Sequence, residues 1–302
     1  QRFWLEARAV SRLEHGNVVR VYDYGTDQNK NPFLVMELLR GRSLTDYLRA
    51  EGLPLSSHLA AHICADVCKG LAAAHSSGLV HRDIKPSNIW LGETSQPGEL
   101  PDVKILDFGL VKGSEVSIHE LTTGGETVGT PSYMSPEQVE GRQTITGTAD
   151  LYSLGVVFFE LVVGHVPYGG SNVTDTLMAH LTQEVPCPAT TTQGTAIPPA
   201  MQAIWQRALT KEPSGRFGSA GEMMHALQMA AAGSAPLNDD TISGLSAMEV
   251  TLDSMHAPTE TQIQAPVSGQ TPLSSRSLMA RERKLVTVVT VRAADRPGQA
   301  RA

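Results

Sequence analysis

The chain has 302 residues, of which 41% are hydrophobic, so it is long enough for one large domain or two modest ones and apolar enough to bury a core. The net charge of −7 argues against a dedicated nucleic-acid binder, because contacts to phosphates need a surplus of Lys and Arg. No stretch reaches the ~18 apolar residues that a membrane span needs. The three cysteines are an odd number, which fits the reducing cytoplasm better than a disulfide-bonded secreted protein.

The first 38 residues predict one helix and two strands. Residues 3–14 repeat apolar side chains at helical spacing, and Glu6 borders that apolar face. Residues 17–25 and 32–39 predict strands that a polar turn separates. Because the chain starts at Gln1 rather than at Met, we expect it to be part of a longer product.

Residues 39–231 predict a mainly helical region. An apolar stripe over residues 59–74 indicates a long helix that stops near Gly78, and further helices are expected near 148–163, 198–210 and 220–231. The last of these begins with a capping-box signature, Ser219 followed by Glu222. Cys64 and Cys68 lie one helical turn apart, and we favour buried packing over a metal pair.

The composition changes at about residue 232. Ser, Thr, Pro, Gly and Gln dominate residues 232–280, which we interpret as a disordered linker because too little apolar area is available to offset ordering. Residues 281–302 open with a basic lead into a strand, which we interpret as the start of a further domain.

One loop and one tripeptide gather the groups that phosphoryl transfer requires. The loop "HRDIKPSN" covers residues 81–88, and "DFG" follows at 107–109. Asp83 can accept a hydroxyl proton and Lys85 can meet a γ-phosphate. Asn88 and Asp107 can hold Mg²⁺ through oxygen atoms, the ligands that this hard cation prefers.

Four motifs carry a resemblance to a known family. "HRDIKPSN", "DFG", "GTPSYMSPE" (129–137) and "KEPSGRF" (211–217) occur in the order and at the spacing of eukaryotic-type (Hanks-type) protein kinases in their bacterial serine/threonine form. The resemblance covers about residues 3–231. It implies an α+β bilobal fold with a truncated upper lobe (1–38) and a mainly helical lower lobe (39–231). It also implies ATP and Mg²⁺ as cofactors and a protein substrate with Ser or Thr, whose hydroxyl receives the γ-phosphoryl group.

The resemblance assigns roles to matching positions. Asp83 resembles the catalytic base, Lys85 the phosphate lysine, and Asn88 and Asp107 the metal ligands, while Thr130 belongs to the substrate shelf. Nucleotide contacts are implied for the acid of the first helix, the adenine-side hinge and the adenine floor, namely Glu6, Met36, Glu37, Leu39 and Trp90.

Regulatory and structural roles are implied in the same way. Arg82, beside the base, is expected to pair with a phosphate on the activation loop, for which Thr122, Thr123 and Thr127 are the candidates. A homodimer that phosphorylates itself in trans is a further expectation. The structural residues are a buried ion pair under the shelf and the anchor of the catalytic loop, namely Glu137, Arg216 and Asp150.

Two parts of the family pattern do not appear in this sequence. The Gly-rich loop and the strand lysine precede the position of Glu6 in the family, and only five residues precede it here. Two hypotheses follow: a serine/threonine kinase domain that is incomplete and inactive alone, or a non-catalytic kinase-like module that binds partners. The four intact residues of the phosphoryl-transfer set favour the first. We also expect the shortened upper sheet to expose an unpaired strand edge.

Overall fold

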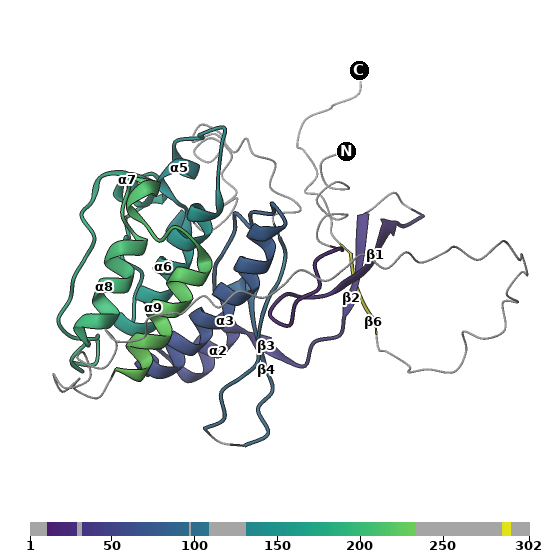
Figure 1. The fold of residues 1–302 in the computed structure, drawn as a ribbon, viewed down its shortest axis with the longest axis horizontal. Helices are drawn as coiled ribbons and strands as arrows, with labels where there is room; N and C mark the ends of the chain where they lie inside the picture. The colour runs from purple at the N-terminus through teal and green to yellow at the C-terminus, as the bar shows by residue number, and fades with distance from the viewer. Residues whose placement is uncertain (1–10, 29–31, 97, 109–130, 234–285, 291–302) are drawn as a thin grey trace, which may run out of the picture. The chain divides into compact units, whose positions relative to one another are not determined.

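A computed structural model describes residues 11–28, 32–96, 98–108, 131–233 and 286–290 (Figure 1). Within these residues the helices are α2 (Leu44–Glu51), α3 (Ser57–Ser76), α5 (Pro136–Val139), α6 (Gly147–Val163), α7 (Val173–Thr182), α8 (Pro199–Ala208) and α9 (Ala220–Ala232). The strands are β1 (Val21–Thr26), β2 (Pro32–Glu37), β3 (Gly41–Ser43), β4 (Ile89–Gly92), β5 (Val103–Ile105) and β6 (Val286–Thr290). The predicted linker 232–280 lies outside the described residues except for its first two.

The long helix α3 starts and stops where its sequence indicates. The side chain of Ser56 accepts a hydrogen bond from the backbone N–H of Leu59, which satisfies a donor of the first turn. After Ser76 the chain leaves the helix through Gly78, whose φ of 75° lies in the left-handed region that favours glycine.

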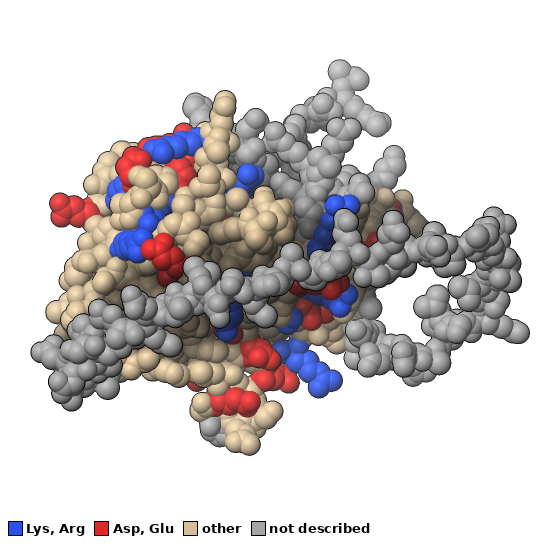
Figure 2. Space-filling model, in the orientation of Figure 1, with Lys and Arg blue, Asp and Glu red and all other residues tan. Residues whose placement is uncertain are grey.

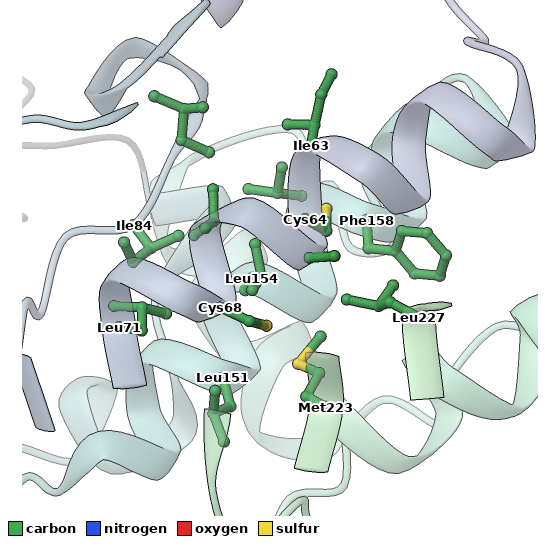
Figure 3. Packing of buried hydrophobic residues seen from close by; sticks show 14 of the residues in the cluster. Ile63, Cys64, Cys68, Leu71, Ile84, Leu151, Leu154, Phe158, Met223 and Leu227 are labelled. Carbon is green, nitrogen blue, oxygen red and sulfur yellow. The ribbon is translucent and has the colours of Figure 1, made fainter. Parts of the chain in front are cut away.

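Helix α6 lies in the middle of the helical layer. Nearly every residue from Ala149 to Val163 is buried, which matches a helix that is apolar on all sides. It packs between α3 and α8, and α9 packs along α3 (Figure 1). In Figure 3 apolar side chains from α3, α6 and α9 meet, and the two cysteine thiols point into this interior. Burial raises the pKa of the Cys64 and Cys68 thiols.

The strands form two separate three-stranded sheets. The first has the order β1–β2–β6 and the second the order β3–β4–β5, and all neighbouring strands are antiparallel. In the order β1–β2–β6, β2 is the central strand, and the expected unpaired edge of this sheet stays a prediction. The register of β2 against β6 runs from Phe33 opposite Thr290 to Glu37 opposite Val286, so β2 has backbone partners on this side.

The sequence-based elements fit the structure unevenly. The helix expected at 3–14 falls mostly outside the described residues, and residues 11–14 are turn and irregular chain. The capping box of α9 is half formed: Ser219 Oγ accepts from the backbone N–H of Glu222 at 3.2 Å. The Glu222 carboxylate accepts instead from the backbone N–H of Gly218 at 2.8 Å, because it also pairs with Arg207. Helix α7 was not predicted, since its residues show no clear apolar stripe.

None of the helices among the described residues is both long and apolar enough to cross a membrane. Figure 2 shows acidic and basic side chains interspersed on the face in view.

Candidate active site

Asp150 fixes the backbone of the loop that contains Asp83. It lies buried in the first turn of α6, where the helix dipole favours a carboxylate. Its two oxygens accept the backbone N–H groups of His81 at 2.9 Å and Arg82 at 2.7 Å. The ring of His75 lies 2.8 Å from the same carboxylate. The interior of the helical layer therefore positions this loop.

The loop is held from a second side by the short helix α5. Gln138 of α5 donates from Nε2 to the carbonyl of Arg82 at 2.8 Å. Its Oε1 accepts from the backbone N–H of Ser135 at 3.1 Å. The Arg82 peptide thus has partners on both α6 and α5.

Two non-glycine residues of the site have left-handed backbone conformations. Arg82 has a φ of 65° and Asp107 a φ of 47°, and no other non-glycine residue among the described ones has a positive φ. Such conformations cost about 1–3 kcal/mol each and persist where the surroundings determine them. Arg82 directly precedes Asp83, and Asp107 is itself one of the two acids that the sequence singled out.

Asp83, Lys85 and Asn88 form one hydrogen-bonded group. The Lys85 ammonium lies 2.9 Å from Asp83 Oδ2. Asn88 Nδ2 donates to the same oxygen at 3.1 Å and to the Asp83 carbonyl at 2.8 Å. Asn88 Oδ1 accepts from the Ser87 hydroxyl at 3.4 Å and has a second lone pair with which it can bind a cation.

Asp107 is attached to this group through β5. The backbone N–H of Leu106 donates to the carbonyl of Asn88 at 2.9 Å, and His81 Nε2 lies 2.7 Å from the carbonyl of Leu106. Local packing raises the pKa of the Asp107 carboxyl although the residue is partly open to solvent. Interaction with His81 and with the Lys85 ammonium lowers this pKa, while the Asp83 carboxylate raises it, so the two acids lie close enough to interact. The structure thus brings Asp83, Lys85, Asn88 and Asp107 together.

The hinge residues lie at the end of β2 and just beyond it. Met36 and Leu39 are half-buried, and the Glu37 side chain turns to Lys104, 2.8 Å away. Trp90 lies on β4, and its indole N–H donates to the carbonyl of Arg40 at 3.2 Å. The Glu37 backbone N–H donates to the carbonyl of Arg20 at 3.0 Å, and Met36 and Glu37 lie opposite Thr287 and Val286 of β6, so the backbone of Glu37 is engaged as well as its side chain.

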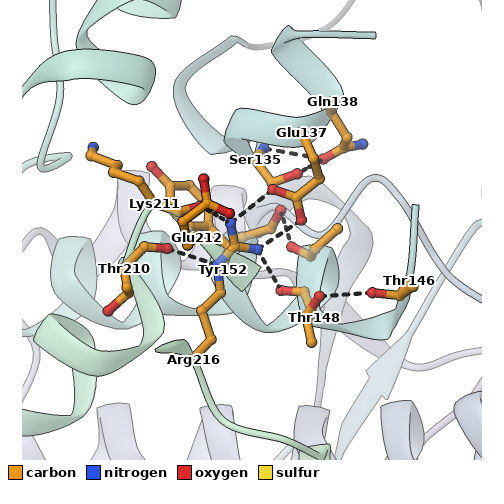
Figure 4. A network of polar contacts seen from close by, with 12 residues as sticks. Ser135, Glu137, Gln138, Thr146, Thr148, Tyr152, Thr210, Lys211, Glu212 and Arg216 are labelled. Carbon is orange, nitrogen blue, oxygen red and sulfur yellow. Dashed lines mark hydrogen bonds and ion pairs between the residues drawn. The ribbon is translucent and has the colours of Figure 1, made fainter. Parts of the chain in front are cut away.

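The helix after the shelf is joined to the loop before α9 by a buried ion pair (Figure 4). Arg216 donates to both Glu137 oxygens, at 2.7 and 2.8 Å, and its side chain is fully enclosed. It also donates to the carbonyls of Thr148, Thr210 and Lys211. This side chain therefore joins α5, the start of α6 and the chain before α9.

Five of the predicted site residues lie outside the described residues: Glu6, Thr122, Thr123, Thr127 and Thr130. Two polar contacts near the site were not predicted. Tyr133 donates from its hydroxyl to Glu160 at 2.7 Å, and burial raises the pKa of both groups. His75 contacts Asp150 although 75 positions separate them, and nothing in the local sequence marks that pairing.

Elements in this order, with an acid–lysine–amide group below a hinge strand, define a protein kinase fold. A family model described as "Protein kinase domain" matches residues 1–229, so the chain belongs to that family, and the predicted α+β fold class and family membership are confirmed.

Named relatives and a solved structure agree with this membership. The chain is 39% identical over 232 residues to serine/threonine-protein kinase Pkn1 of Myxococcus xanthus, covering 77% of this chain and 32% of that protein. It is 39% identical over 219 residues to PknL of Mycobacterium tuberculosis, covering 72% and 52%. It superimposes on the crystal structure of the Mycobacterium tuberculosis PknI kinase domain with a TM-score of 0.57 and 24% identity, covering 76% and 78%. The chain thus spans about a third to a half of these two curated relatives.

Proposed function

We propose that the chain supplies the catalytic domain of an ATP:protein serine/threonine phosphotransferase. The observation that carries this proposal is the group of Asp83, Lys85 and Asn88 with Asp107 beside it. A module that only binds partners has no chemical need of two acids, an amide and an amine in one place. The named relatives, all serine/threonine-protein kinases, support the substrate class.

The residues fit a divalent cation. Asn88 presents an amide oxygen while its nitrogen donates to Asp83, and Asp107 presents a carboxylate at the open side of the site. These are hard oxygen ligands, which suit Mg²⁺. When bound, Mg²⁺ neutralises charge on the phosphates of ATP.

The chain's own side chains have separate tasks in the transfer. The oxygen of a substrate Ser or Thr hydroxyl bonds to the γ-phosphorus, and the bond from that phosphorus to the bridging oxygen of ADP breaks. Asp83 orients the hydroxyl and receives its proton, and the Lys85 ammonium donates hydrogen bonds to the moving phosphoryl group. Leu38 and Leu39, which follow the last ladder pair of β2, would hold the adenine edge, with Trp90 as the floor beneath the ring.

The test measures transfer of labelled γ-phosphate from ATP and Mg²⁺ to a Ser/Thr protein substrate by the full-length product of the gene. Asp83→Asn is expected to lower the rate by about 10²–10⁴-fold. Asp102→Asn, which removes an exposed carboxylate elsewhere, is the matched control and should leave the rate unchanged. Equal rates for Asp83→Asn and the parent would refute the assignment of the base. Nucleotide binding without any transfer by the parent would favour the non-catalytic module.

We further propose that Arg82 responds to phosphorylation of Thr122, Thr123 or Thr127, introduced by a second copy of the chain. The fixed Arg82 peptide supports this proposal, since it holds a cation next to the base. Threonine-to-alanine variants, mass spectrometry of the phosphorylated protein and mixing of active with Asp83→Asn copies test it. Phosphate on the Asp83→Asn copies is the expected result, and its absence would refute transfer in trans.

A further inference from the structure

An ion pair joins the hinge strand to the strand that leads to Asp107. Glu37 is the last residue of β2, and Lys104 is the middle residue of β5. Lys104 Nζ lies 2.8 Å from Glu37 Oε1, and the two side chains are 24% and 23% exposed. The same Glu37 oxygen accepts the backbone N–H of Arg20 at 2.8 Å, so the carboxylate has two donors and one orientation.

The pair bridges two sheets that share no strand ladder. β2 belongs to the sheet β1–β2–β6, and β5 belongs to β3–β4–β5. Backbone bonds attach the chain before β1 to β5, from Ile105 to the Asn17 carbonyl and from Val19 to the Ile105 carbonyl, both at 2.9 Å. The ion pair adds a link from β2 itself, the strand that ends in the hinge.

Lys104 links the hinge strand to the part of β5 that leads to Asp107. It lies three residues before Asp107, and its partner across the ladder is Trp90. The Trp90 indole in turn donates to Arg40, just past the hinge. Lys104 therefore contacts Glu37 at the end of the strand that enters the hinge. It also lies beside Trp90, which is bonded to the chain that leaves the hinge.

We propose that Lys104 is a positioning residue that, through Glu37, sets the adenine-side backbone at a fixed distance from Asp107. This inference rests on the proposed function for its kinetic consequence, but the contact itself is independent of activity. A nucleotide must engage both ends at once, so loosening the link lowers its affinity. The phosphoryl-transfer step is affected less, because Asp83, Lys85 and Asn88 keep their own contacts.

The experiment compares four single variants of the full-length protein and one double variant. Lys104→Met removes the charge and keeps the chain length, whereas Lys104→Arg keeps the charge. Glu37→Gln weakens the pair but can still accept from Arg20. Lys69→Met is the matched control, since it removes an ion pair of similar length, 2.7 Å to Asp66, on α3.

Lys104→Met is expected to raise the KM for ATP about two- to fivefold with kcat nearly unchanged, the effect of losing one partly exposed ion pair. Lys104→Arg should restore the parent KM, and Lys104→Met with Glu37→Gln together should cost less than the sum of the two. Hydrogen exchange should quicken in residues 36–40 and 103–106 and stay unchanged in α3 and α6.

Each result decides the proposal. Unchanged exchange at the hinge in Lys104→Met would overturn it, as would a fall in kcat with KM unchanged or an equal effect of Lys69→Met. If the parent neither binds nor turns over ATP, the proposed function fails, while exchange in the hinge still reports on the Glu37–Lys104 link.

Discussion

Replacing Arg216 by methionine removes five hydrogen bonds at once. Two go to the Glu137 carboxylate, at 2.7 and 2.8 Å, and three go to the carbonyls of Thr148, Thr210 and Lys211, at 3.0, 2.8 and 2.8 Å. The variant leaves a carboxylate buried without its counter-charge, which costs about 3–5 kcal/mol in other proteins. A typical domain is stable by about 5–15 kcal/mol, so we expect the loss of a large fraction of the free energy of unfolding.

Urea denaturation followed by tryptophan fluorescence, to which the buried Trp205 contributes, measures this loss. Adding Glu137→Met to Arg216→Met removes the stranded charge, so the double variant should be more stable than the sum of the single losses predicts, by about 1–3 kcal/mol. Arg49→Met, which removes an exposed ion pair with Asp46, should change stability by about 0–1 kcal/mol. A loss below about 1 kcal/mol for Arg216→Met, or strict additivity in the double variant, would refute the reasoning.

Three further predictions concern pH, packing and the loop anchor. Burial lowers the pKa of His180 to about 4, so as the pH falls the unfolded chain binds a proton at this residue before the folded chain does. Between about pH 6.5 and 4 we therefore expect the free energy of unfolding to fall by about 3 kcal/mol, and His180→Asn should abolish this fall. Equal pH profiles of parent and variant would contradict the prediction. Gly70→Ala should lose about 1–3 kcal/mol in thermal or urea unfolding, because its new Cβ would lie 2.8 Å from a backbone oxygen, whereas Gly16→Ala, with no atom within 4 Å, should not. Asp150→Asn should speed hydrogen exchange of the His81 amide, since a bond to a charged acceptor contributes about 1.5–3 kcal/mol, and unchanged exchange would exclude the anchor role.

The helical part of the fold was largely accessible from local sequence. The apolar stripe of α3 and the continuous apolar run of α6 each predict a buried helix, because helical periodicity is visible within a single segment of sequence. Helix α7 was missed because it is short and its apolar residues form no clear stripe along successive turns.

Some residues of the candidate site were predictable from the sequence and others were not. The loop 81–88 and Asp107 are close in sequence and carry their chemistry in the motif, so residue type and order were enough to single them out. The Glu37–Lys104 link was not accessible, because 67 positions separate the two and nothing distinguishes this pair among 24 basic and 31 acidic residues. The pairing of β2 with β6 was missed for the same reason, since a strand pattern does not name its partner.

The burial of α6 on all sides fixes the position of the Asp150 carboxylate in its first turn. A helix locked between neighbours cannot rotate or slide without breaking their packing, and Asp150 at its first turn is therefore stationary. Substitutions of the buried Phe158 or Trp205 should therefore loosen the packing that holds α6, and with it the position of Asp150. Loss-of-function substitutions should therefore occur in the hydrophobic core around α6 as well as around Asp83 and Asp107.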